Sequence, residues 1–68
     1  MTKTAFRKAL AVADHGKGYI YTEVGQSGTH YEYYFWCDRE GYALRNETTG
    51  NTVFTGYNRK LAEEIMVH

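Results

Sequence analysis

The chain of 68 residues has no proline, a single cysteine and no net charge, because eight basic side chains balance eight acidic ones. With Cys37 alone, no disulfide can form within the chain, which excludes the cross-linked scaffolds of small secreted domains and favours the cytoplasm. No apolar run approaches the roughly 20 residues of a membrane span. No signal peptide is expected, because the alanine-rich stretch that ends at Asp14 is too short and too polar.

What the chain does contain is aromatic side chains: seven tyrosines, three phenylalanines and one tryptophan. Apolar residues make up 43% of the chain at zero net charge, which argues against intrinsic disorder. We expect one domain over residues 1–68, and a domain of this size buries only roughly 60% of its unfolded surface. The aromatic rings are therefore expected to supply much of the buried apolar area.

The spacing of apolar residues predicts a helix at each end of the chain. Residues 4–14 carry an apolar stripe at the helical period, and Thr2 or Thr4 can cap the first turn. A second helix is expected from about Arg59, capped by Asn58. The two stripes consist of Phe6, Ala9, Leu10 and Ala13 in the first helix and of Leu61, Ala62, Ile65 and Met66 in the second.

Between the predicted helices the hydrophobic period changes to two, which is typical of strands. The expected strands are 19–24, 29–38, 42–47 and 52–55. Each connection between them is too short for a parallel crossover, which leaves a four-stranded antiparallel meander. Because each helix has one apolar stripe, we expect an α+β fold of order α-β-β-β-β-α, with both helices on one sheet face and the other face open.

Alternation along the strands predicts which side chains lie on each face. We expect the helices to cover Ile20, Thr22, Val24, Tyr31, Tyr33, Phe35, Cys37, Tyr42, Leu44 and Phe54. The uncovered face would then carry a partner-binding surface made of Tyr19, Tyr21, Glu32, Tyr34, Trp36 and Arg45. Tyrosine and tryptophan are enriched where a few residues dominate binding energy. The alternative is structural, since cross-strand aromatic pairs also stabilise a sheet. A slip of one residue in the second strand would exchange its two sets.

A protein is the expected partner, and inhibition or modulation of that protein is the expected function. Small domains of this kind often act so, including those of phages and mobile elements. One alternative is nucleic-acid binding, through the sheet aromatics or through Lys3, Arg7, Lys8 and Lys17. Against it, the only charged side chains between residues 19 and 38 are acidic and would repel phosphates. A second alternative is self-assembly, with the same face forming a homodimer.

Enzymatic chemistry, cofactors and metals are not expected. His30 and Cys37 lie seven residues apart in one predicted strand, which places them on opposite faces and separates a base from a nucleophile. His30 and Glu32 share a face, but two ligands do not make a zinc site. A domain this small also offers little wall for a substrate pocket.

Overall fold

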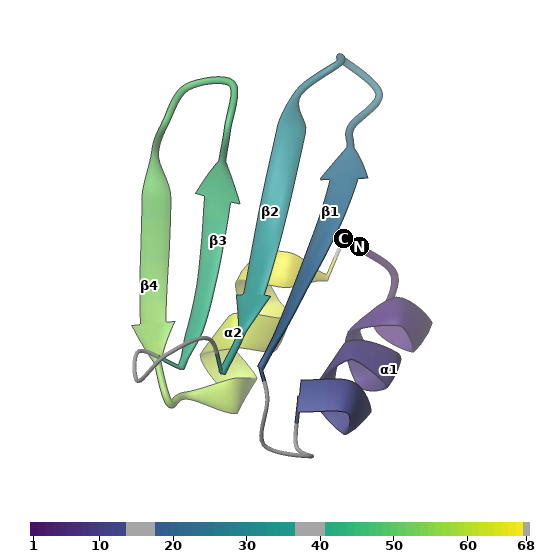
Figure 1. Ribbon diagram of the computed structural model, residues 1–68, viewed down its shortest axis with the longest axis vertical. Coiled ribbons are helices and arrows are strands. Elements are labelled where there is room, and N and C mark those ends of the chain that lie inside the picture. Colours follow the sequence, from purple (N-terminus) through teal and green to yellow (C-terminus); the bar gives the residue numbers. More distant parts are fainter. Residues whose placement is uncertain (14–17, 37–40, 68) are drawn as a thin grey trace.

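The computed structural model describes residues 1–13, 18–36 and 41–67. It contains two helices and a four-stranded antiparallel sheet of strand order β1-β2-β3-β4, which confirms the predicted meander (Figure 1). In chain order the elements are α1 (Lys3–Ala13), β1 (Tyr19–Val24), β2 (His30–Phe35), β3 (Tyr42–Asn46), β4 (Thr52–Gly56) and α2 (Arg59–Met66).

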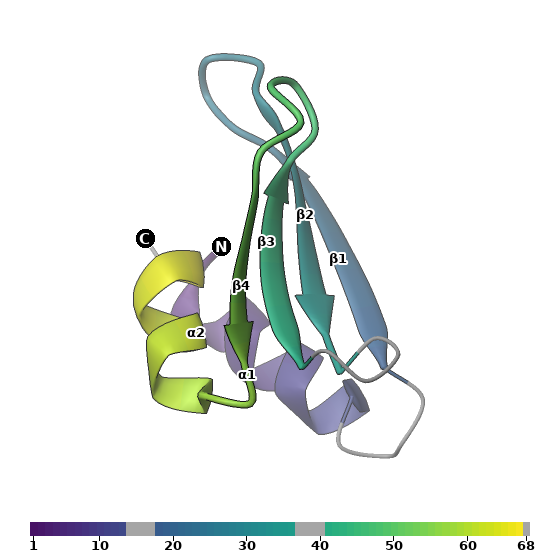
Figure 2. The ribbon, with the colours of Figure 1, turned by 90° about the vertical axis from the view of Figure 1, so that its left-hand side faces the viewer.

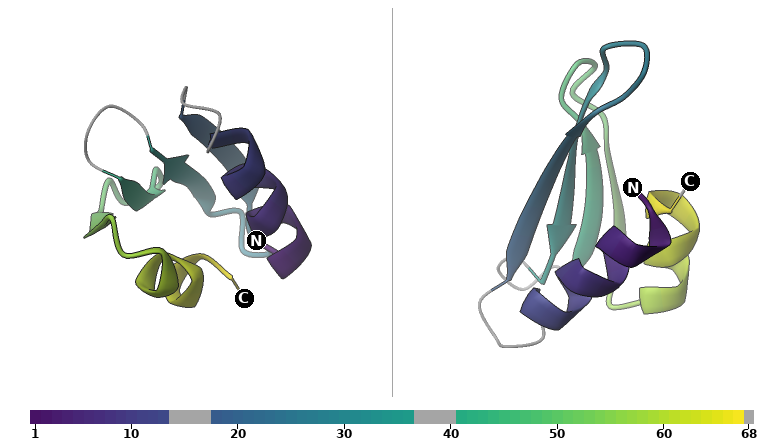
Figure 3. Two further views of the ribbon diagram at one scale, coloured as in Figure 1. Left: turned by 90° about the horizontal axis from the view of Figure 1, so that it is seen from below. Right: turned by 90° about the vertical axis from the view of Figure 1, so that its right-hand side faces the viewer.

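Both helices lie on the same side of the sheet, as predicted (Figures 2 and 3). Helix α1 contacts β1 and β2, whereas α2 contacts β3 and β4, so the helices share the covered face between them. Among the described residues, no helix or strand covers the other side of the sheet (Figure 2). We call this uncovered side the open face.

Helix α2 begins at Arg59 as predicted, and α1 begins at Lys3, one residue before the predicted start. The Thr2 side-chain oxygen accepts a hydrogen bond of 3.1 Å from the amide of Ala5, and the Asn58 side chain accepts one of 3.0 Å from the amide of Leu61. Such bonds satisfy amides that the first helical turn leaves without a partner. The expected end of the first helix, at residues 15 and 16, lies outside the described residues.

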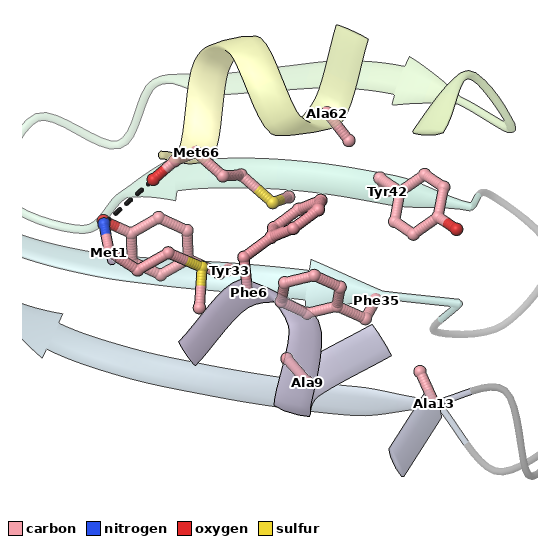
Figure 4. Close-up of a cluster of buried hydrophobic side chains, with 9 residues drawn as sticks. All are labelled: Met1, Phe6, Ala9, Ala13, Tyr33, Phe35, Tyr42, Ala62 and Met66. Carbon is pink, nitrogen blue, oxygen red and sulfur yellow. Dashed lines mark hydrogen bonds between the residues drawn. The ribbon is translucent and has the colours of Figure 1, made fainter. Parts of the chain in front are cut away.

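The core is a thin layer of aromatic, alanine and methionine side chains between the sheet and the helices (Figure 4). Its buried members are Met1, Phe6, Ala9, Ala13, Tyr33, Phe35, Tyr42, Ala62 and Met66. The Phe35 ring lies at its centre, with ring centroids 5.7 Å from Phe6 and 6.1 Å from Tyr42. The predicted placement of these rings and of Tyr33 in the core is confirmed.

A polar network closes one end of this core. The buried amino group of Met1 donates hydrogen bonds to the Met66 carbonyl at 2.9 Å and to the Tyr33 hydroxyl at 3.2 Å. It also forms an ion pair of 3.2 Å with Glu23, which accepts a 2.8 Å hydrogen bond from the Tyr33 hydroxyl. A buried charge is costly unless it is paired and hydrogen-bonded, and both conditions are met here.

The prediction for β1 is wrong, because its two faces are exchanged. Tyr19 and Tyr21 pair with Phe35 and Tyr33 across the strands, so all four side chains lie on the covered face. Both tyrosines are partly buried against the core, whereas Ile20 is 48% exposed. A tyrosine ring can fill the space beneath a short helix while its hydroxyl reaches the rim, which a shorter aliphatic side chain cannot do.

Three further predictions of core residues on the outer strands fail. Thr22 is exposed, Val24 and Phe54 are 60% and 62% exposed, and all three lie on the open face. For Phe54 the reason is its pairing with Ala43 in β3, next to a register shift between Tyr42 and Ala43. Thr55 is the buried residue of β4 instead, and its hydroxyl donates to the Tyr42 carbonyl at 3.3 Å.

Candidate functional site

The open face is built from two rows of side chains that run across all four strands. Directly paired residues of antiparallel strands share a face, so the register assigns the members of each row. The apolar row is Ile20, Tyr34, Ala43 and Phe54, and the polar row beside it is Thr22, Glu32, Arg45 and Thr52. Each strand therefore contributes one apolar and one polar side chain to the centre of this face.

The apolar row is exposed at its two ends. Ile20 on β1 and Phe54 on β4 are 48% and 62% exposed, while Tyr34 between them is half-buried and Ala43 is buried. Val24 is a further exposed apolar side chain of β1 on this face, and Thr22 of the polar row lies between it and Ile20. Exposed large apolar side chains that gather on one face of a protein are typical of interaction sites.

The polar row holds the aromatic ring of the apolar row in place. The Tyr34 hydroxyl donates a hydrogen bond of 2.7 Å to Glu32, and the Arg45 guanidinium lies 4.0 Å from the same carboxylate oxygen. The hydrogen bond to Glu32, together with burial, raises the pKa of the Tyr34 hydroxyl above its ordinary value. Tyr34 is thus fixed along its own strand before any partner arrives, which lowers the entropy cost of binding.

The structure brings together three of the six residues predicted for the partner-binding surface. Glu32, Tyr34 and Arg45 are neighbours on the open face. Tyr19 and Tyr21 lie on the covered face, so their predicted exposure on the uncovered side is wrong. The three apolar residues that the prediction left out of this surface are Ile20, Val24 and Phe54. The cross-strand register of the structure places these residues on the open face, and no local pattern in the sequence does so.

Trp36, the sixth residue, does not continue the alternation of β2. Its backbone has a φ of 57°, in the left-handed region, and β2 ends at the preceding residue. The indole packs against the rings of Tyr42 at 4.9 Å and Tyr57 at 5.2 Å, and it is partly buried beside the core. Trp36 therefore has a packing role.

The four basic residues predicted as a nucleic-acid contact are not part of the open face as the structure describes it. Lys3, Arg7 and Lys8 are exposed on α1, on the other side of the sheet from the open face (Figure 3). Lys17 lies outside the described residues. Lys8 also lines a hollow of about 150 Å³ between α1 and β1, together with Ala5, Ala9, Val12, Tyr19 and Tyr21.

Two further observations concern chemistry and membranes. Within residues 1–13, 18–36 and 41–67, no three His, Cys, Asp or Glu side chains gather closely enough to hold a metal ion. Cys37, the sole candidate nucleophile of its type, lies outside these ranges. In the same part of the chain, neither helix has the length and apolar character required to cross a bilayer.

Comparison with known proteins gives no relative from which a function could be transferred. The chain matches no protein-family model, no curated protein and no solved structure.

Proposed function

We propose that this protein is a non-enzymatic binding module that docks a protein partner on its open face. The observation that carries the proposal is the apolar row, in which every strand contributes one apolar side chain on the side that the helices leave uncovered. Ile20 and Phe54 keep 48% and 62% of their surface exposed there, so a large part of their apolar area is not used in folding. Burying them against a partner would gain about 25 cal/mol for each Å² removed from water.

The charges near the apolar row favour a protein over a nucleic acid. The polar row contains one acidic and one basic side chain, Glu32 and Arg45, so it offers no excess of positive charge to a phosphate backbone. The exposed basic residues of α1 belong to the other side of the molecule. An apolar strip beside a balanced pair of charges instead matches the composition of protein interfaces, which have an apolar centre and a polar rim.

Tyr34 is proposed as the anchor of this surface. Its ring lies between Ile20 and Ala43 in the apolar row, and its hydroxyl is held by Glu32. Inhibition or modulation of the partner, a cytoplasmic location and an origin in a phage or mobile element belong to the same proposal. They rest on the size and composition of the chain.

The test compares variants of the open face with a matched variant elsewhere. Ile20→Thr combined with Phe54→Thr removes the ends of the apolar row but keeps residues that favour strands. Leu61→Gln removes an apolar side chain of α2 that is 40% exposed, and glutamine retains helix propensity. Each folded protein is immobilised, proteins captured from a host lysate are quantified, and the affinity of the captured partner is then measured by calorimetry.

The expected result is a partner that binds the wild type and Leu61→Gln equally well. Its affinity for the double threonine variant should fall by about 30-fold or more, which corresponds to about 2 kcal/mol and to the loss of dominant contacts. Equal affinity for all three proteins would refute the proposal. Binding that falls steeply with salt and is lost on removing Lys3, Arg7 and Lys8 would favour the nucleic-acid alternative.

A further inference from the structure

The outer edge of β4 is a second surface with features of an interaction site, because it combines an unpaired strand edge with exposed apolar side chains. In the described part of the chain, β3 is the only strand that pairs with β4, so the opposite edge of β4 is the edge of the sheet. Figure 2, which views the molecule from this side, shows β4 in front of the rest of the sheet. Val53 and Phe54 are 52% and 62% exposed on this strand.

The hydrogen-bond pattern identifies which backbone groups point outward. The amide of Asn46 donates to the Asn51 carbonyl at 2.8 Å, so these two residues form a hydrogen-bonded pair. Bonded and non-bonded pairs alternate along an antiparallel ladder, which directs the groups of Val53 toward β3 and those of Thr52 and Phe54 away from it. A second hydrogen bond agrees with this assignment. The Glu47 amide donates to the His30 carbonyl, so Glu47 and every second residue before it direct their backbone groups toward β2, and the residues between them direct theirs toward β4.

No charged side chain protects this edge. Residues 48–58 contain no lysine, arginine, aspartate or glutamate, and the chain has no proline. Natural sheets usually block exposed edges with charges or proline, because an open edge pairs with other strands. The edge formed by β1 differs, since that strand contains Glu23 and α1 runs beside it (Figure 1).

We propose that the edge of β4 pairs with the β4 edge of a second copy of this chain. In antiparallel pairing about a twofold axis at Val53, Thr52 of each copy lies opposite Phe54 of the other. All outward groups of these two residues are then used, in four backbone hydrogen bonds. The two Val53 side chains meet at the axis as a non-bonded pair, where side chains approach most closely. A second copy fits this edge because the register is complementary to itself and brings no like charges together.

The pairing would create one continuous sheet of eight strands. Five residues of β4 span about 17 Å, so the contact is short and a weak, concentration-dependent dimer is expected, with dissociation in the micromolar range. The open faces of the two copies would become one surface, with Phe54 of each copy beside the axis. This inference does not depend on the proposed docking of another protein, and each can fail without the other.

The first experiment measures mass by sedimentation equilibrium, over a concentration range from about 10 μM to about 1 mM. Thr52→Pro removes one outward amide and leaves the ladder to β3 intact, because an edge strand tolerates proline where its amide faces solvent. Thr22→Pro is the matched control, since Thr22 occupies the same row of the open face and points its amide outward from β1. The circular dichroism of both variants confirms folding.

The wild type and Thr22→Pro should dimerise alike, and Thr52→Pro should raise the dissociation constant by tenfold or more. A wild type that stays monomeric over the whole range would overturn the inference. So would a dimer that Thr22→Pro disrupts and Thr52→Pro does not, because the edge of β1 would then be responsible.

A charge exchange at Val53 tests the proposed axis without any proline. Its side chain is 52% exposed, so Val53→Lys and Val53→Glu should each fold and remain monomeric, because like charges would face each other across the axis. An equal mixture of the two variants should restore the dimer. Absence of dimer in the mixture, or dimerisation of each variant alone, would contradict a twofold axis at this residue.

Discussion

Because the two faces of β1 are exchanged, we predict that loss of the Tyr21 side chain destabilises the protein more than loss of the more hydrophobic Ile20 side chain. Replacing Tyr21 by alanine removes a ring that packs at 5.8 Å against Tyr33, in an edge-to-face arrangement. If about 100 Å² of its surface is buried, the loss is about 2.5 kcal/mol. The ring pair adds about 0.5–1.5 kcal/mol. Tyr21→Ala should therefore lower the free energy of unfolding by about 3 kcal/mol, a large part of the stability of so small a protein.

Ile20→Ala is the matched comparison at the neighbouring position. The Ile20 side chain is 48% exposed, so only about half of a full burial energy of 1.5–3 kcal/mol is at stake, or about 1 kcal/mol. Urea denaturation followed by circular dichroism gives both values, because the midpoint and slope yield the free energy of unfolding. A Tyr21→Ala protein that is unfolded in water beside a folded Ile20→Ala protein supports the same conclusion. A larger loss for Ile20→Ala than for Tyr21→Ala would refute the register of β1.

Two further stability predictions follow from the glycines and the core tyrosine. Gly41→Ala should cost about 3 kcal/mol or more, because a Cβ atom there would lie 2.0 Å from the Gly56 carbonyl oxygen at a φ of +80°. Gly50→Ala, at a φ of +81° with open space around it, should cost only about 1–2 kcal/mol in thermal unfolding, and equal losses would contradict this packing. Burial and the hydrogen bond to Glu23 raise the pKa of Tyr33 in the folded protein, so stability should fall as pH rises above about 10, where the unfolded chain releases this proton. In urea titrations at several alkaline pH values, Tyr33→Phe should show a shallower loss than the wild type, and an unchanged slope would contradict this assignment.

The positions of the secondary-structure elements could be predicted because their signals are local. The apolar spacing around Phe6 and the capping groups of Thr2 and Asn58 act within one or two turns of a helix. Glycines with positive φ, such as Gly28 and Gly50, mark turns where other residues are strained. None of these signals depends on residues far away in the chain.

The division of faces could be predicted only in part, because it depends on pairing between strands. In β2 alternation separated the residues correctly, since Glu32 is charged and Phe35 is apolar. In β1 both sets contain apolar groups, and the aliphatic residues were assigned to the core because they are the more hydrophobic. Contacts between residues far apart in the chain favour the opposite arrangement. Tyr21 pairs with Tyr33, and Glu23 accepts a hydrogen bond from the Tyr33 hydroxyl and forms an ion pair with the amino group of Met1.

The position of Trp36 could not be predicted for a different reason, which is its backbone conformation. Its positive φ ends the alternation of β2 and turns the indole toward Tyr42 and Tyr57, away from the exposed position that a regular strand would give it. A non-glycine residue in the left-handed region is uncommon, and no pattern in the neighbouring sequence indicates it. Trp36 is therefore not part of the candidate site, in which the aromatic side chains are those of Tyr34 and Phe54.

Phe54 connects the two surfaces proposed for this protein. Its side chain ends the apolar row of the open face, and its backbone groups point outward from the edge of β4. A partner large enough to span both copies of the open face would bind the dimer more tightly than the monomer, and by linkage it would strengthen dimerisation by the same factor. Ile20→Thr changes the docking surface directly, and Thr52→Pro changes the pairing edge directly, so the direct effect of each change can be measured on its own. If the two surfaces are coupled, Thr52→Pro should also weaken docking, by a factor that falls to one as the protein is diluted below its dimerisation range.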